Sequence, residues 1–202
     1  MDNIELARFY DDEKEELVTV TVSGYNKLIE SKDRNGISCF LYHRLYSRYL
    51  KPFIFGSRDY KDKYKNGFSM MANFCLLVET IQSFKNGWGD SHKKSELAFK
   101  QFFNNNSNFI ELNQKGSIIY KNIRCGILHQ GETAGGWKIT REGKVLFDNS
   151  TNTIDAVLFA ERLEKSLKDY SENLKTSEWD SELWDNFRTK MRKVVKNCES
   201  KS

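Results

Sequence analysis

The fold is decided by the stretch GFSMMANFCLLVETIQSF, which covers residues 67–84. Its apolar residues recur at steps of three and four, which is the period of one face of an α-helix. The members of this face are Phe74, Leu77, Val78, Ile81 and Phe84, with Met70 and Met71 leading in. Gly87 follows, where a C-cap glycine commonly ends a helix. The spacing therefore predicts a long helix with one buried face.

Helical spacing continues on both sides of this stretch. It predicts further helices over residues 37–50, 95–103, 118–130, 153–174 and 177–198. The single proline, Pro52, follows the first of these, and the chain has only 12 glycines, too few for the turns of a β-sandwich or barrel. We therefore expect an all-α fold, a single domain over residues 1–202 that forms a bundle of five or six helices with its last few residues frayed.

Two segments carry the alternation of a β-strand. Residues 17–22 alternate and are rich in β-branched side chains, which favours a strand, but the helical spacing before and after them favours a helix over residues 4–30. We expect the helix there. The second segment, residues 137–147, has two short runs around Gly143. It predicts a small β-hairpin after the helix over 118–130, as the only β structure of the chain.

The composition excludes several classes of protein. The formal net charge is only +4, and most of the charged residues are Lys and Glu interleaved on faces expected to be solvated. A weakly positive chain still permits an anionic partner such as RNA. No run of about 18 apolar residues exists, and the acidic N-terminus lacks the apolar core of a signal peptide, so we expect no membrane span and a cytoplasmic protein. The four cysteines form no C-x-x-C pair and predict neither disulfides nor a zinc site. We expect no metal and no cofactor.

The residues with chemical potential gather in the segment YKNIRCGILHQGET, residues 120–133. His43 and His92 have no metal-ligand neighbour at a usable spacing, whereas His129 follows Arg124 with four residues between them on a predicted helix. Imidazole titrates near neutrality and carries protons, and guanidinium stays charged and binds phosphate oxygens bidentately. Arg124 and His129 are therefore the candidate catalytic residues.

This segment resembles the Arg-x4-6-His signature of the HEPN family. The likeness extends to GFSMMAN and VETI in the helix over 67–84 and to IRCGILHQGET before a Gly-Gly-Trp hairpin, so that it covers most of residues 64–175. The resemblance implies a HEPN-like bundle and a metal-independent endoribonuclease that cuts RNA with the substrate's 2′-hydroxyl as nucleophile. It also implies a homodimer, a role as a toxin or in antiviral defence, and control by an antitoxin or regulatory protein. Many HEPN nucleases carry Asn or Asp directly after the arginine, where this chain has Cys125.

The number of proton carriers also favours a dimer. RNA cleavage by the 2′-hydroxyl needs a base for the 2′ proton, an acid for the leaving 5′ oxygen and a cation at the phosphorane. One Arg and one His provide the cation and a single proton carrier, whereas two facing copies provide both carriers. Five residues rotate by about 140° along an α-helix, so Arg124 and His129 do not lie on one face. Gly126 between them suggests close approach of a partner helix or an RNA backbone.

Flanking residues extend the candidate site. Lys121 and Gln130 are candidate RNA contacts, although an exposed lysine is the common alternative. Asn122 and Glu132 are candidate supporting groups around the pair. Glu79, a polar residue on an otherwise apolar helix, either orients the arginine or is simply exposed, as most glutamates are.

Readings without catalysis stay open at this point. In one of them Arg124 pairs with Glu132, and His129 interacts with the C-terminal end of its own helix, which favours the protonated imidazole. The chain is then a HEPN-like binding or regulatory module for nucleotides or a partner protein. A third reading is a plain helical interaction protein outside this family.

Overall fold

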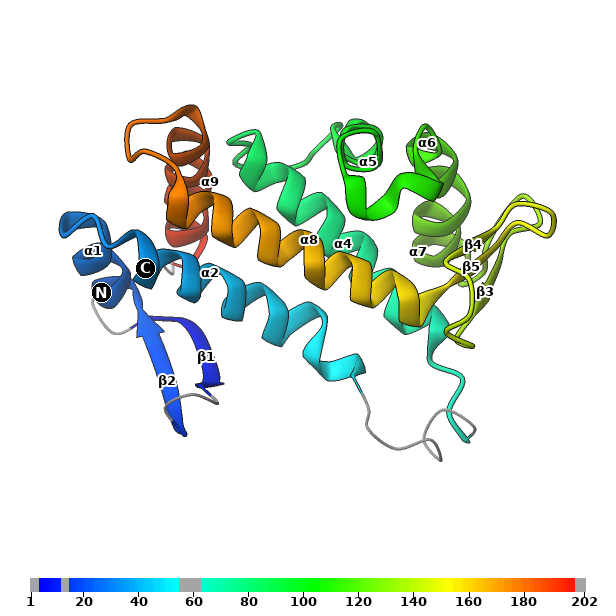
Figure 1. The fold of residues 1–202 in the computed structure, drawn as a ribbon, viewed down its shortest axis with the longest axis horizontal. Coiled ribbons are helices and arrows are strands. Elements are labelled where there is room, and N and C mark those ends of the chain that lie inside the picture. Colours follow the sequence, from blue (N-terminus) through cyan, green and yellow to red (C-terminus); the bar gives the residue numbers. More distant parts are fainter. Residues whose placement is uncertain (1–3, 12–14, 55–62, 199–202) are drawn as a thin grey trace. The chain divides into compact units, whose positions relative to one another are not determined.

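The computed structural model describes residues 4–11, 15–54 and 63–198 (Figure 1). The chain divides into two compact units, each assembled from separate stretches. The first holds the chain before Tyr49, the segment Ser83–Asp90 and the chain from Leu167 onward, and the second holds Tyr49–Gln82 and Ser91–Ser166. Most described residues are helical, which confirms the helix-dominated fold. The fraying expected at the C-terminus falls on residues outside the described ones.

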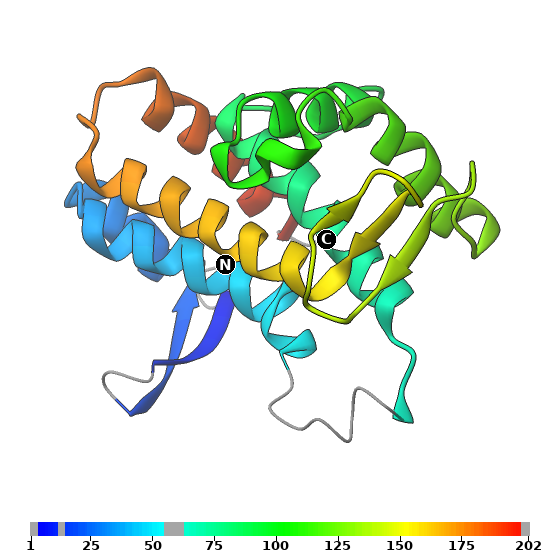
Figure 2. The ribbon, with the colours of Figure 1, turned by 45° about the vertical axis from the view of Figure 1, so that its right-hand side comes forward.

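Most of the predicted helices are present at the expected places (Figures 1 and 2). Their bounds are α1 (Val22–Glu30), α2 (Arg34–Tyr49), α4 (Gly67–Lys85), α5 (Ser95–Asn104), α8 (Ala156–Thr176) and α9 (Glu182–Cys198), with 3₁₀ turns η1 (Lys51–Phe53) and η2 (Ser107–Leu112). The decisive stretch forms α4, and Gly87 beyond its end has a φ of 64°, the left-handed conformation that ends many helices.

The first unit contains an antiparallel strand pair where a helix was expected. β1 (Glu5–Asp11) pairs with β2 (Glu16–Thr21), and α1 follows directly. The expectation of a helix over residues 4–30 is therefore wrong for the strands and right for α1. Alternating β-branched side chains lose little freedom on a pleated strand but are restricted in a helix. Thr21 marks the boundary, because its side-chain oxygen accepts a 3.1 Å hydrogen bond from the amide of Gly24 and caps α1.

Aromatic side chains join the helices of this first unit. The ring of Tyr25 on α1 lies 5.7 Å from that of Phe40 on α2. Phe187 on α9 stacks on Phe84 at 5.7 Å and meets Trp184 edge-on at 5.3 Å. All five rings are buried, so burial of aromatic surface stabilises this part of the fold.

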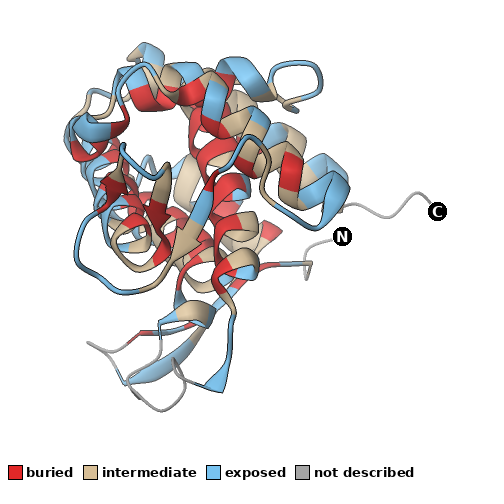
Figure 3. Cartoon of the chain, turned by 90° about the vertical axis from the view of Figure 1, so that its right-hand side faces the viewer, coloured by how far each residue is buried: buried red, intermediate tan, exposed pale blue. Residues whose placement is uncertain are grey.

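The core of the second unit is a cluster of phenylalanines. Phe159 on α8 stacks on Phe74 of α4 at 6.0 Å and lies 4.9 Å from Phe109 and 6.1 Å from Phe103. These rings are fully buried. Figure 3 shows buried and exposed residues alternating along the helices. α4 differs from the single buried face expected of it, because its polar residues Glu79, Gln82 and Ser83 are buried as well. The cluster is in the same unit as the candidate site and holds α4 and the start of α8 together.

A small mixed sheet replaces the expected hairpin. β3 (Lys138–Thr140) runs parallel to β5 (Thr153–Asp155), and β4 (Phe147–Asp148) runs antiparallel to it, so the order is β3-β5-β4. The two predicted strands do not pair with each other. Residues 153–155 were expected in a helix. Asp155 instead caps α8, because its Oδ1 accepts 2.9 Å hydrogen bonds from the amides of Val157 and Leu158. The preceding residues are thereby left to form the central strand.

The helix expected over residues 118–130 is divided into three parts. α6 (Gly116–Ile119) leads into η3 (Tyr120–Cys125), which is a π-helix, and α7 (Gly126–Gln130) follows. Gly131 ends α7 with a φ of 69°, as predicted. Among the described residues, no helix combines the length and apolar character needed to cross a membrane.

The candidate Arg–His site

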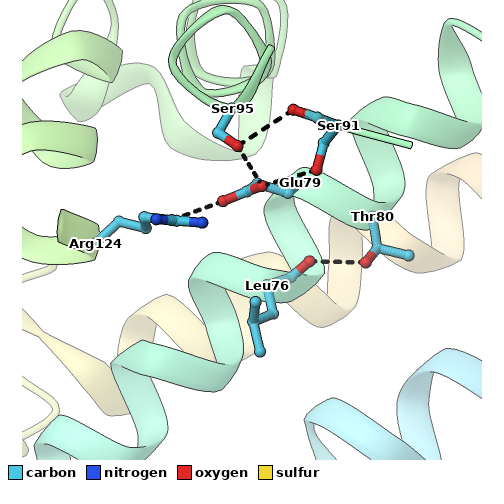
Figure 4. A network of polar contacts seen from close by, with 6 residues as sticks. All are labelled: Leu76, Glu79, Thr80, Ser91, Ser95 and Arg124. Carbon is cyan, nitrogen blue, oxygen red and sulfur yellow. Dashed lines mark hydrogen bonds and ion pairs between the residues drawn. The ribbon is translucent and has the colours of Figure 1, made fainter. Parts of the chain in front are cut away.

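Arg124 lies in η3 and forms an ion pair with Glu79 of α4 (Figure 4). Its Nε donates to Glu79 Oε1 at 2.9 Å, and the side chains are 18% and 8% exposed respectively. Of the two alternatives for Glu79, the structure therefore shows a buried carboxylate in contact with the arginine. Glu132, the other proposed partner of Arg124, is exposed and accepts a hydrogen bond from the amide of Thr133 instead.

Two serines hold the other oxygen of the same carboxylate. Oε2 of Glu79 accepts a 2.8 Å hydrogen bond from the hydroxyl of Ser95 and a 3.2 Å bond from that of Ser91 (Figure 4). Ser95 is the first residue of α5, so the network joins α4, α5 and η3. A carboxylate with bonds on both oxygens has a defined orientation and imposes that orientation on the arginine.

The ion pair engages one edge of the guanidinium group. Partial burial acts to lower the pKa of Arg124, but the charge and hydrogen bond of Glu79 outweigh it and raise the pKa above its usual value. Only Nε bonds to the carboxylate, and no hydrogen bond or ion pair joins either terminal nitrogen to another residue in the described part of the chain. The fork of terminal N–H groups, which is the part that fits a phosphate, is therefore still available.

The π-helical geometry explains the neighbours of Arg124. A π-helix bonds residue i to residue i+5, so Tyr120 and Cys125 come together on one turn. Hydrogen bonding to Cys125 is the main cause that raises the pKa of the Tyr120 hydroxyl. The guanidinium carbon of Arg124 lies 5.7 Å from the centre of the Tyr120 ring. Tyr120 therefore lies close to both Cys125 and the guanidinium group.

A cavity of about 460 Å³ opens beside this turn. Its lining residues are Glu96, Ser117, Ile118, Tyr120, Lys121, Asn122 and Cys125. Lys121 is exposed at its surface. Neither Arg124 nor His129 lines this cavity.

His129 lies near the end of α7 and is exposed. No hydrogen bond or ion pair joins its ring to any side chain that the structure describes, Arg124 included. Gln130 is exposed in the same way. Within one copy of the chain, the arginine is held against Glu79 while the histidine is exposed to solvent.

Gly126 allows a close approach, but of the chain's own return segment. A Cβ at Gly126 would lie 2.5 Å from the carbonyl oxygen of Glu132. Next to it, the carbonyl of Asn122 accepts a 2.8 Å hydrogen bond from the amide of Ala134. The expectation that a partner helix or RNA occupies the space at Gly126 is therefore wrong. Asn122 and Glu132 help to seat this return segment through their backbone atoms.

The sequence reading missed Ser91, Ser95 and Tyr120. Ser95 opens the helix predicted over residues 95–103 and Ser91 lies four residues before it, and their spacing alone does not indicate a shared partner on α4. Tyr120 is missed because an α-helical spacing does not place it beside Cys125, whereas a π-turn does. Within the described residues, no group of three or more His, Cys, Asp or Glu side chains has a metal-binding arrangement.

The chain was compared with protein-family models, with curated proteins and with solved structures, and none of the three comparisons found a match.

Proposed function

We propose that this protein is a metal-independent endoribonuclease of the HEPN type, which cuts RNA by attack of the substrate's own 2′-hydroxyl. The observation that carries the proposal is the state of Arg124. The buried Glu79, with hydrogen bonds on both carboxylate oxygens, fixes the Nε of Arg124. The terminal nitrogens of Arg124 stay available to a phosphate. A cation held in advance of the reaction stabilises the charge that develops on the phosphorane without reorganising.

The proton transfers fall to His129. Because its imidazole is exposed and has one nitrogen that can accept a proton and one that can donate it, it is suited to exchange protons with a substrate that binds at the surface. One copy provides a single proton carrier where the reaction needs two, so the active site takes the Arg–His pairs of two copies in a homodimer. Exposed apolar side chains on the same helical segment support such a contact, since Ile118 is 47% and Leu128 is 44% exposed.

Cleavage of an end-labelled RNA in the presence of EDTA tests this proposal. We expect cleavage to persist and to leave a 2′,3′-cyclic phosphate and a 5′-hydroxyl, since the 2′-hydroxyl is the nucleophile. DNA of the same sequence has no such group and should stay intact. His129→Ala should lower the rate by about 10²–10⁴-fold. His92→Ala, at another exposed histidine, is the matched control. Loss of cleavage in EDTA, or equal cutting of DNA, would show that the mechanism is wrong.

The biological setting that goes with this activity is that of a toxin or defence nuclease restrained by an antitoxin or regulatory protein. Expression of the wild-type chain should then slow bacterial growth, and expression of His129→Ala should not. Arg124→Lys should be inactive, because an ammonium group cannot both bond to Glu79 and offer a phosphate the two-pronged N–H donors of a guanidinium group.

A second function is favoured by one specific observation. Arg124 forms an ion pair with the buried Glu79, and His129 is exposed and forms no hydrogen bond or ion pair within the described residues. These facts suit a HEPN-like binding or regulatory module without catalysis. Absence of RNA cleavage under any condition, together with identical growth of cells expressing wild type and His129→Ala, would favour this second function.

A further inference from the structure

A groove of about 450 Å³ lies in the first unit between α1 and α9. Its lining residues are Tyr25, Asn26 and Ile29 from α1 and Arg188, Arg192, Val195 and Lys196 from α9. Three of these seven residues are cations and none is a carboxylate. The groove therefore combines a positive wall with an apolar floor.

The cations are spaced regularly along α9. Arg188, Arg192 and Lys196 follow each other at steps of four residues, so they share one side of the helix. Each step advances by about 6 Å along the axis. That distance is close to the separation of neighbouring phosphates along a nucleic-acid strand. Successive phosphates can thus meet Arg192 and Lys196, which have no carboxylate partner among the described residues, while Arg188 is ion-paired with Asp185.

The negative end of the helix dipole does not explain this arrangement. Its effect is confined to the last turn, which contains Lys196. Arg188 lies well before that turn, and its guanidinium forms an ion pair with Asp185 and donates a hydrogen bond to the carbonyl of Trp179. Arg192 is exposed, and one of its nitrogens bonds to the hydroxyl of Thr189.

The floor of the groove suits a base. Tyr25 is buried, and burial raises the pKa of its phenol, while Arg188 and Arg192 act on it in the opposite direction. The tyrosine thus lies within the electrostatic reach of both arginines. Ile29 and Val195 provide apolar contacts beside it. A nucleobase has an apolar face for such a floor, and its strand carries the phosphates for the wall.

We propose that this groove binds the backbone of single-stranded RNA, so that it is a substrate-holding site in addition to the Arg–His site. The inference rests on the proposed ribonuclease function. Recognition is through phosphates and stacking, so it does not distinguish RNA from DNA, and the discrimination falls to the chemistry of the 2′-hydroxyl.

The test measures the binding of a fluorescein-labelled single-stranded RNA to the full chain carrying His129→Ala, which separates binding from cleavage. Arg192→Gln with Lys196→Gln removes two phosphate contacts. Each contact on a single strand contributes about 0.7 to the slope of log K against log salt concentration, so the slope should become shallower by about 1.4. Near 0.1 M salt the same factor weakens binding by about 25-fold. Single-stranded DNA should respond in the same way.

A matched control removes two exposed lysines elsewhere, Lys165→Gln on α8 with Lys144→Gln before β4, and should leave affinity and slope within about twofold of the parent. If the wild type cuts RNA but the groove double variant binds like this control, the groove is not the binding site and the proposed function stands. If the His129→Ala parent does not bind RNA and the wild type does not cut it, both proposals are wrong. Circular dichroism of each variant verifies that it is folded.

Discussion

Replacing Glu79 by Gln gives the sharpest test of the site, because it removes a charge and keeps the shape. The carboxylate of Glu79 accepts bonds from Arg124 Nε, Ser91 and Ser95, and its side chain is only 8% exposed. A glutamine retains one acceptor oxygen for the arginine, and the serine hydroxyls can rotate to accept from its amide. What is lost is the charge opposite a largely buried guanidinium.

The magnitude follows from the geometry of the pair. Unit charges about 4 Å apart attract by about 4 kcal/mol at an effective dielectric constant of about 20, and breaking a buried pair typically costs 3–5 kcal/mol. Arg124 is 18% exposed, so solvent recovers part of this loss. We expect Glu79→Gln to lower the free energy of unfolding by about 3 kcal/mol. Ser95→Ala, which removes one bond to the charged group, should cost about 2 kcal/mol.

The assay is urea unfolding followed by circular dichroism, with the denaturant dependence of the transition compared between variants. Glu172→Gln is the matched control, since Glu172 pairs with Lys175 at 3.5 Å with both side chains about half exposed, and it should cost less than about 0.5 kcal/mol. Arg124→Gln completes a double-mutant cycle, in which the coupling with Glu79→Gln should be about 2 kcal/mol. A coupling below about 0.5 kcal/mol would refute the view that this pair is a buried ion pair that fixes the arginine.

Further predictions concern the packing, the pH dependence and the dimer. Gly126→Ala should destabilise the fold by about 1–3 kcal/mol in the same unfolding assay, because its Cβ would meet a backbone oxygen at 2.5 Å; unchanged stability would contradict this packing. Asp155→Ala should cost about 3 kcal/mol, since the side chain is 1% exposed and accepts from three backbone amides; Asp155→Asn should retain part of this. Hydrogen bonds from Ser150 and Thr151 lower the pKa of Asp148 from 3.8 to about 2, so its contribution to stability is present above pH 3.8 and is lost as the pH falls through about 2. A carboxyl NMR titration checks this, and a midpoint near 4 would contradict it. Leu128→Glu should convert a dimer into a monomer by light scattering, whereas Ile110→Glu, at a more exposed position outside the motif segment, should not; a monomeric wild type would count against the dimeric site.

The local part of the structure follows from the sequence. Residues 67–84 have a helical period, and the period alone places Phe74, Val78 and Ile81 on a buried side, as found. Glycines at 87 and 131 end their helices with positive φ, which follows from a preference of glycine that no tertiary contact is needed to express. The sequence also singles out Arg124 and His129, because few residue types combine charge and proton transfer.

The tertiary structure decided the features that depend on residues distant in sequence. Residues 153–155 form a central strand only because residues 138–140 and 147–148 come to either side of them, and a local period does not register such partners. The strands before α1 were misjudged for the same reason, since β1 and β2 satisfy each other's backbone groups.

The site itself shows the same division. Sequence alone left Glu79 between an exposed surface residue and a partner of Arg124, a separation of 45 residues along the chain. Burial decided between them, because a carboxylate removed from water needs a cation and hydrogen-bond donors, and only the packing of α4 against α5 and η3 brings these groups together. The residue types were therefore determined by the sequence, and their pairing was determined by which of them the fold removes from solvent.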